Sequence, residues 1–256
     1  MELRTGLVVN GRSCPYEPGE TILYAAERAG IEIPTLCHFP RVASPGTCGV
    51  CVVEIKGRQG LVPACSTKAA PGMEVFTESA RVVEARREVI SAMLATGNHN
   101  CAARGADDGN WADFQLSVQK SEGDIRLCPA WGDCRLQDLA YRYQASPGGG
   151  PQVLRIMPVM PENPFFRRDY TRCIRCGRCV TACNMVQVNM ALEFDFSAHN
   201  TGSEKDFPIP NELCVHCGEC VQACPVGALV YAQGRIEKTG SRRKRSPAAE
   251  AVEARA

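Results

Sequence analysis

The sequence predicts an α+β protein built from several small domains, and three observations lead to this prediction. The chain has 256 residues, 45% of them hydrophobic and 22% charged, which is typical of globular proteins with packed cores. It contains 16 cysteines but only 4 histidines. The cysteines fall into spaced groups, the first of them after a strand-and-helix pattern near the N-terminus. The cysteines are therefore expected to determine the function.

Residues 1–78 are expected to form the first domain, with a β-hairpin followed by a helix. The apolar run Leu7-Val8-Val9 leads into Asn10-Gly11, a pair that favours the positive φ of a hairpin turn. The helix is expected to end at Gly30, because apolar residues recur at helical spacing before it: Ile22, Ala25, Ala26 and Ala29.

Four cysteines of this first domain follow the pattern C-x10-C-x2-C-x13-C: Cys37, Cys48, Cys51 and Cys65. Four thiolates, three of them on a loop rich in Pro and Gly, are typical of a plant-type 2Fe-2S centre in a β-grasp domain. Zinc also takes four-cysteine sites, and it stays an alternative for this set taken alone.

The C-terminal third carries two copies of C-x2-C-x2-C-x3-C, the second followed by Pro225. Three thiolates at three-residue steps wrap one cluster, and the fourth belongs to the neighbouring cluster. Three cysteines at successive three-residue steps are not a pattern of zinc sites, so zinc is disfavoured here. The pattern predicts a bacterial-type 2x4Fe-4S ferredoxin domain over 151–240, with one cluster held by Cys173, Cys176, Cys179 and Cys224 and the other by Cys214, Cys217, Cys220 and Cys183.

Two further features of this region follow from the sequence. Met185–Leu213 is expected to form an insert, since 30 residues separate Cys183 from Cys214. The first cysteine motif is crowded by arginines whose charge would offset a negative cluster: Arg167, Arg168, Arg172, Arg175 and Arg178.

The middle of the chain, 79–150, combines one histidine with three cysteines. A helix expected from about Ser79 to Thr96, with one apolar face, precedes Gly97-Asn98-His99-Asn100-Cys101. Further on stands Leu127-Cys128-Pro129-Ala130-Trp131-Gly132-Asp133-Cys134-Arg135-Leu136-Gln137. The two segments resemble the N-terminal iron-sulfur region of complex I large subunits, formate dehydrogenases and iron hydrogenases. They look most like the diaphorase iron-sulfur subunit of soluble NAD-reducing nickel-iron hydrogenases.

This resemblance implies a small 4Fe-4S domain over 79–150, ligated by His99, Cys101, Cys128 and Cys134. The chain departs from the family in one place, where 26 residues lie between Cys101 and Cys128 instead of the usual two. Lengthening a surface loop costs little closure entropy, so all four ligands are still expected to meet. The insert, 102–127, is expected to be a surface flap on its own domain or a contact with a partner subunit.

These assignments use 15 of the 16 cysteines and leave Cys14, expected to be a buried thiol. A disulfide scaffold is disfavoured, because it needs an oxidising compartment and the N-terminus does not resemble a signal peptide. No apolar run is long enough to cross a membrane, and the formal net charge of +1 does not suggest a nucleic-acid partner. We expect a cytoplasmic protein with a linker at Ser146–Pro151 and a mobile tail at 241–256.

The sequence contains no Gly-x-Gly-x-x-Gly fingerprint, no phosphate-binding loop and no nucleophile paired with a base, so no catalytic residues are expected. The resemblance implies one 2Fe-2S and three 4Fe-4S clusters in a hetero-oligomer. The chain would relay single electrons between an FMN-containing, NAD(P)H-oxidising flavoprotein subunit and a nickel-iron hydrogenase subunit. An NAD-dependent formate dehydrogenase or an electron-bifurcating complex is the alternative setting. A metal-stabilised structural or sensing module is the alternative of another class.

Overall fold

The computed structural model describes residues 4–40, 42, 46–95, 99, 130, 133–146, 159–160, 166–169, 172–193 and 212–231. Several expectations lie outside these ranges. They concern Cys101 and Cys128, the insert 102–127, most of the linker 146–151 and the tail 241–256.

The N-terminal region forms a five-stranded mixed sheet with strand order β2-β1-β5-β3-β4. Its strands are β1 (Arg4–Val9), β2 (Arg12–Tyr16), β3 (Val52–Ile55), β4 (Leu61–Pro63) and β5 (Glu74–Phe76). β1 pairs antiparallel with β2 and parallel with β5, while β3 pairs antiparallel with β4 and β5. The expected hairpin is confirmed, since Asn10 and Gly11 both have positive φ, 50° and 78°.

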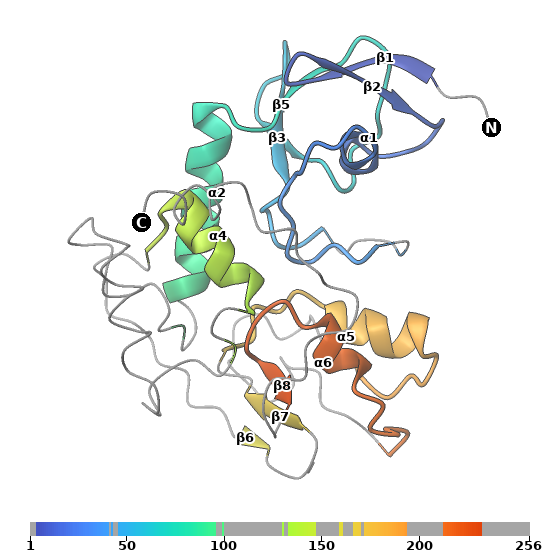
Figure 1. Ribbon diagram of the computed structural model, residues 1–256, viewed down its shortest axis with the longest axis vertical. Coiled ribbons are helices and arrows are strands. Elements are labelled where there is room, and N and C mark those ends of the chain that lie inside the picture. The colour runs from blue at the N-terminus through green and yellow to red at the C-terminus, as the bar shows by residue number, and fades with distance from the viewer. Residues whose placement is uncertain are drawn as a thin grey trace, which may run out of the picture.

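Helix α1 (Ile22–Arg28) packs beside this sheet, as the upper part of Figure 1 shows. It ends before Gly30, whose φ is 73°, so the expected helix and its terminating glycine are confirmed. Its apolar face and the sheet close one core, whose fully buried members include Ile22, Ala25, Ala26, Leu7 and Val53. Cys14 lies in this core and is fully buried, as expected.

Helices α2 (Ala80–Ala95) and α4 (Arg135–Tyr143) lie next to each other in the middle of the molecule (Figure 1). The Ser79 hydroxyl accepts a hydrogen bond from the Val82 amide at 3.4 Å, which helps to start α2. The buried stripe of α2 runs through Val82, Arg86, Ile90 and Leu94. The sequence therefore predicts the helix correctly, but it does not reveal an arginine in the buried stripe.

The C-terminal region combines a small antiparallel sheet, in the order β6-β7-β8, with short helices. The sheet consists of β6 (Val159–Met160), β7 (Phe166–Asp169) and β8 (Leu229–Tyr231). The short helices are α5 (Arg178–Thr181), the π-helical turn η2 (Ala182–Val186) and α6 (Glu219–Ala223). No helix in the ranges that the structure describes is long and apolar enough to span a membrane.

A second apolar core joins the middle of the chain to the C-terminal region. It contains residues of α2 and α4 together with Phe166, Val221 and Leu229. It also contains cysteines from all three regions, including Cys37, Cys134, Cys176 and Cys220. Cysteines of all three regions therefore border this core, while Cys51 and Cys65 of the first set belong to the core of the N-terminal sheet.

Candidate iron-sulfur centres

The four cysteines of the first set come together where the loop before β3 meets the end of β4. Cys37, Cys48 and Cys51 precede β3, and Cys65 follows β4. All four are buried, with 1% to 6% of their surface exposed. Gly49, between the second and third of them, has a φ of 69°, a conformation that glycine adopts without strain.

The four thiols are arranged as two pairs. Cys48 is hydrogen-bonded to Cys37, which lowers the pKa of Cys37 to about 5 and raises that of Cys48. Cys51 and Cys65 are hydrogen-bonded in the same way, with the pKa of Cys65 lowered and that of Cys51 raised. In a 2Fe-2S cluster each iron takes two thiolates, so two adjacent pairs fit such a cluster. Within the described residues, no three His, Cys, Asp or Glu side chains converge as they would around a single metal ion.

The two repeated motifs of the C-terminal region have the same loop conformation. Arg175 and His216, each directly before the second cysteine of its motif, both have a φ of 55°. Gly177 and Gly218 have φ values of 74° and 82°. Each glycine starts a short helix, α5 or α6, that carries the third cysteine of its motif. The sequence duplication is therefore repeated in the backbone.

One cavity, here called the first cavity, gathers four cysteines from both motifs: Cys173, Cys176, Cys179 and Cys224. The other lining residues are mainly apolar, among them Ile174, Val226 and Leu229. The Arg175 amide donates a hydrogen bond to the Cys173 Sγ at 3.4 Å. The fourth cysteine, Cys224, reaches this cavity from the second motif because α6 ends directly before it.

Another cavity, here called the second cavity, gathers the complementary four: Cys183, Cys214, Cys217 and Cys220. Cys183 comes from the first motif and lies in η2, the π-helical turn that extends α5. Such turns are frequent at functional sites. The structure therefore brings the eight cysteines together in the interleaved arrangement that the spacing predicts, four to each cavity.

The thiols around these cavities are electrostatically suited to a cationic group. Burial, together with neighbouring thiolates, raises the pKa of Cys176 and of Cys179. Burial also raises the pKa of Cys220 to about 11, although the nearby Arg168 lowers it. Grouped thiolates are costly in an apolar interior, whereas iron in a cluster deprotonates and stabilises them. The donor sets of both cavities thus fit the cluster that each is expected to hold.

The histidine-cysteine set is described only in part. His99 and Cys134 are both buried, with 6% and 5% of their surface exposed, while Cys101 and Cys128 lie outside the described residues. Cys134 is the residue directly before α4. The amide of the next residue, Arg135, donates a hydrogen bond to the Pro225 carbonyl at 2.7 Å. Cys134 therefore lies beside the wall of the first cavity, which Pro225 lines.

Arg178 connects the first cavity to the loop of the first cysteine set. Its Nε donates to the Ala223 carbonyl at 2.8 Å, and its Nη1 donates to the His38 carbonyl. The guanidinium carbon lies 5.1 Å from the centroid of the Phe39 ring. Burial lowers the pKa of Arg178, while the thiolates of Cys176, Cys224 and Cys37 raise it. The guanidinium of Arg178 therefore lies near cysteines of the first cavity, Cys176 and Cys224, and near Cys37 of the first set.

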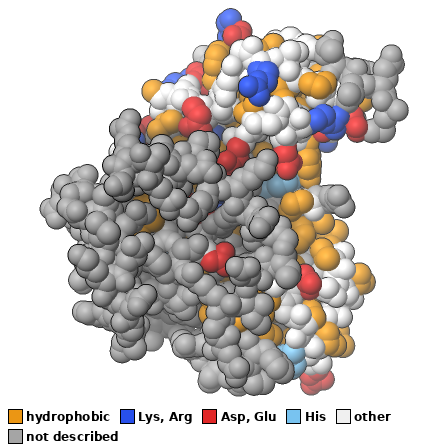
Figure 2. Space-filling model, viewed as in Figure 1, with side chains coloured by type: hydrophobic (Ala, Val, Ile, Leu, Met, Phe, Trp, Pro, Cys, Tyr) orange, Lys and Arg blue, Asp and Glu red, His pale blue; other side chains and the backbone are white. Residues whose placement is uncertain are grey.

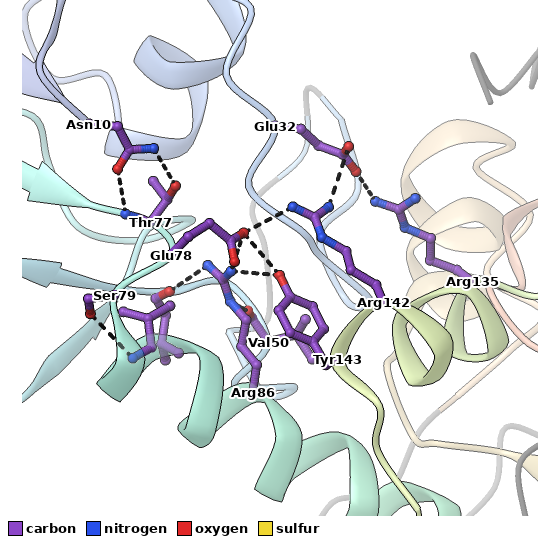
Figure 3. A network of polar contacts seen from close by, with 12 residues as sticks. Asn10, Glu32, Val50, Thr77, Glu78, Ser79, Arg86, Arg135, Arg142 and Tyr143 are labelled. Atoms are coloured by element: carbon purple, nitrogen blue, oxygen red, sulfur yellow. Dashed lines mark hydrogen bonds and ion pairs between the residues drawn. The ribbon is translucent and has the colours of Figure 1, made fainter. Parts of the chain in front are cut away.

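Arg86 fixes the first cysteine loop to the middle helices (Figure 3). It is fully buried in α2 and donates to the carbonyls of Val50 and Val52 at 2.9 and 2.8 Å. Its Nη1 also donates to the Tyr143 hydroxyl at 2.8 Å and pairs with Glu78 at 3.0 Å. Sequence reasoning missed this residue, because an arginine in an amphipathic helix usually faces solvent.

The described residues bear on two further expectations. Arg168 lines the second cavity, together with Cys183 of the first motif and the three cysteines Cys214, Cys217 and Cys220 of the second. The described cysteines, Cys14 among them, are all free thiols. The Cys14 thiol donates to the Arg12 carbonyl at 3.5 Å.

Comparisons with known proteins agree with these centres. Residues 4–80 match the family described as 2Fe-2S iron-sulfur cluster binding domain, and residues 172–228 match the 4Fe-4S dicluster domain. The chain is 34% identical over 190 residues to a subunit of the NADH-quinone oxidoreductase of Rhizobium meliloti, a match that covers 73% of this chain and 19% of that protein. It is 32% identical over 188 residues to the HndD subunit of the NADP-reducing hydrogenase of Solidesulfovibrio fructosivorans, covering 71% of this chain and 28% of that subunit.

The chain therefore spans between a fifth and somewhat over a quarter of these curated relatives. A solved structure, NAD+-reducing [NiFe]-hydrogenase in the H2-reduced state, contains a chain of similar fold with a TM-score of 0.65 and 28% identity. That match covers 90% of this chain and 88% of the other. The expected resemblance is thus confirmed: the chain is a homologue of subunits of NAD(P)-linked oxidoreductases and carries a 2Fe-2S cluster-binding domain and a 4Fe-4S dicluster domain.

Proposed function

We propose that this chain is an iron-sulfur electron-transfer subunit. It would relay single electrons between an NAD(P)H-oxidising flavoprotein subunit and a nickel-iron hydrogenase subunit. The observation that supports this most strongly is the match to a chain of an NAD+-reducing [NiFe]-hydrogenase over nearly the whole length of both chains. Cysteines of all three regions border the core that joins the middle of the chain to the C-terminal region, and such closeness supports a relay.

The proposed cluster ligands follow the geometry described above. In a β-grasp domain over 1–78, a 2Fe-2S cluster would be held by Cys37, Cys48, Cys51 and Cys65. In the domain over 79–150, a 4Fe-4S cluster would be held by His99, Cys101, Cys128 and Cys134. In the 2x4Fe-4S domain over 151–240, one cluster would be held by the four cysteines of the first cavity and one by those of the second.

When bound, these clusters would supply one-electron redox chemistry, while the chain itself provides thiolates, burial and fixed geometry. Arg178 holds the first cavity against the loop that carries Cys37. Arg86 fixes the loop that leads into Cys51. These contacts would keep neighbouring clusters at a constant separation. We further propose that the complex is a hetero-oligomer and that it is located in the cytoplasm.

The direct test is anaerobic purification of the native assembly through this chain, followed by mass spectrometry of its partners and metal analysis. We expect an FMN-containing flavoprotein and nickel-iron subunits to co-purify. A molybdenum or tungsten subunit in place of nickel-iron would instead support the formate dehydrogenase setting. Recovery of the chain alone, or with zinc in place of iron, would contradict the relay and favour a free carrier or a metal-stabilised structural module.

A second experiment tests the relay itself. The chain carries no dinucleotide fingerprint, so NADH alone is expected to leave the isolated chain oxidised. Addition of the flavoprotein subunit should then bleach the visible absorbance of the clusters. Rapid reduction of the isolated chain by NADH would show that it has a substrate site of its own.

A further inference from the structure

Arg168 is a buried cation on the wall of the second cavity. Phe166 and Arg168 are two positions apart on β7, so both side chains lie on the same face of the strand. Both are buried, with 1% and 5% of their surface exposed, and the guanidinium carbon lies 4.6 Å from the centroid of the Phe166 ring. The side chain is therefore held in place by packing.

The guanidinium is close to the cysteines of this cavity. Arg168 and all four cysteines line it, and the charge of Arg168 lowers the pKa of Cys220. The Nη2 atom of Arg168 is buried and has no hydrogen-bond partner among the residues that the structure describes. A buried guanidinium N–H without an acceptor costs free energy, so such a group indicates that an acceptor is still to be added.

Arg178 at the first cavity differs in this respect. Its Nε and Nη1 donate to the carbonyls of Ala223 and His38. It contributes charge to the first cavity, but these N–H groups are already used in holding protein segments together. Unlike these groups of Arg178, the Nη2–H of Arg168 can still donate to whatever the second cavity binds.

We propose that Arg168 tunes the reduction potential of the cluster in the second cavity, by donating its Nη2–H to a sulfur atom of that cluster. The inference rests on the proposed function, because it requires a 4Fe-4S cluster held by Cys183, Cys214, Cys217 and Cys220. Reduction adds a negative charge to the cluster. A fixed cation and a hydrogen bond to sulfur both favour the reduced state and raise the potential.

Three substitutions separate the charge from the hydrogen bond. Arg168→Lys keeps the charge, Arg168→Gln keeps an N–H donor without charge, and Arg168→Met keeps only the apolar stem. The matched control is Arg81→Gln, which removes an exposed arginine of α2 that pairs with Glu54 outside the two cavities. The measurement is an anaerobic redox titration of the cluster-loaded chain followed by EPR, with iron counted in each sample.

The potential of one 4Fe-4S signal should shift to more negative values, most in Arg168→Met, less in Arg168→Gln and least in Arg168→Lys. The same signal should be perturbed by Cys217→Ser, and Arg81→Gln should leave every potential unchanged. An unchanged potential in Arg168→Met at full iron content would overturn the proposal. If Arg168→Met loses about four irons, the proposal is tested by the other two variants, and the potential should then be more negative in Arg168→Gln than in Arg168→Lys. Loss of those irons in all three variants would also overturn it, since Arg168 would then be a structural residue.

A second readout is independent of the potential. Pulsed EPR on a chain labelled with 15N-arginine should show a nitrogen coupling to the reduced cluster that disappears in Arg168→Gln. The proposed function and the role of Arg168 would be contradicted by different results. A wild-type chain without iron would contradict the proposed function, whereas intact clusters with unshifted potentials would contradict only the role of Arg168.

Discussion

The first and second cavities are built from the same motif but lie in different surroundings. Their loops share positive φ at Arg175 and His216 and at Gly177 and Gly218, and each gathers four cysteines. The first cavity faces the rest of the chain, where Arg178 ties it to His38 and Pro225 accepts a hydrogen bond from Arg135. The second cavity has no such tie within the described residues.

The segments that supply cysteines to the second cavity carry exposed apolar side chains, here called its rim. Cys217 is exposed, and large hydrophobic side chains with 47% to 70% of their surface exposed flank its cysteines in both segments: Met185, Val186, Val188, Met190, Leu213 and Val215. Figure 2 shows hydrophobic side chains along the edge of the molecule where Figure 1 places α5 and α6. The duplicated motif thus sets which cysteines come together, while the contacts of each copy set the surroundings of its cavity.

The largest effect is expected from exchanging the fourth cysteines of the two motifs for serine. Cys224→Ser should disturb the same EPR signal as Cys176→Ser, because both line the first cavity, with a loss of up to about four irons per chain. Cys183→Ser should disturb the signal that Cys217→Ser disturbs. If Cys224→Ser instead disturbed the signal that Cys217→Ser disturbs, the cysteines of one motif would hold one cluster and the interleaved arrangement would be wrong.

A smaller effect is expected from Arg178→Met, which removes the tie of the first cavity to the first cysteine loop. Losing two charge-assisted hydrogen bonds to carbonyls should destabilise the cluster-loaded chain by about 2 kcal/mol, seen as a lower midpoint of thermal unfolding. Arg81→Met, at an exposed arginine of α2, is the matched control and should change the midpoint little. Equal midpoints for the two variants would mean that Arg178 does not hold the regions together.

Equal and moderate effects are expected from Gly177→Ala and Gly218→Ala. Both glycines have left-handed φ, and an alanine there costs about 1 kcal/mol. A Cβ on Gly218 would lie 3.7 Å from the Tyr231 hydroxyl, which is ordinary contact, so strain of the backbone is the only cost. Thermal unfolding of the two variants measures this, and a large difference between them would show that the two loops are not equivalent.

The smallest effect is expected at the rim of the second cavity. Met185→Gln and Leu213→Gln replace side chains that are 63% and 58% exposed, so the free energy of unfolding should change by less than about 0.5 kcal/mol. The buried Leu229, on the wall of the first cavity, is the contrasting position, and Leu229→Ala should cost about 3 kcal/mol. Similar losses at rim and wall would contradict the outward position of the second cavity.

Much of this architecture could be predicted from the sequence, because its signals are local. The Asn10-Gly11 turn, the helix ending before Gly30 and helix α2 all follow from turn chemistry and helical spacing. The grouping of eight cysteines into two interleaved sets also follows from spacing, since three-residue steps fix which thiolates can reach one cluster.

The buried arginines could not be predicted in the same way. Arg86 occupies the core stripe of α2 because carbonyls of the cysteine loop and the Tyr143 hydroxyl, far away in sequence, accept its hydrogen bonds. Arg168 and Arg178 are close in sequence, whereas in the structure Arg168 lines the second cavity and Arg178 lies near Cys176 and Cys224 of the first. Long-range pairing, not local pattern, decides the position of a charged side chain.

The central claim is that the cysteine groups hold iron-sulfur clusters, and counting iron and acid-labile sulfide in the anaerobically purified chain tests it most directly. We predict about 14 irons per chain, falling by about two in Cys51→Ser and not at all in Cys14→Ser, the one cysteine outside the sets. About ten irons would contradict the histidine-cysteine site at His99. Stoichiometric zinc with no sulfide would contradict the account as a whole.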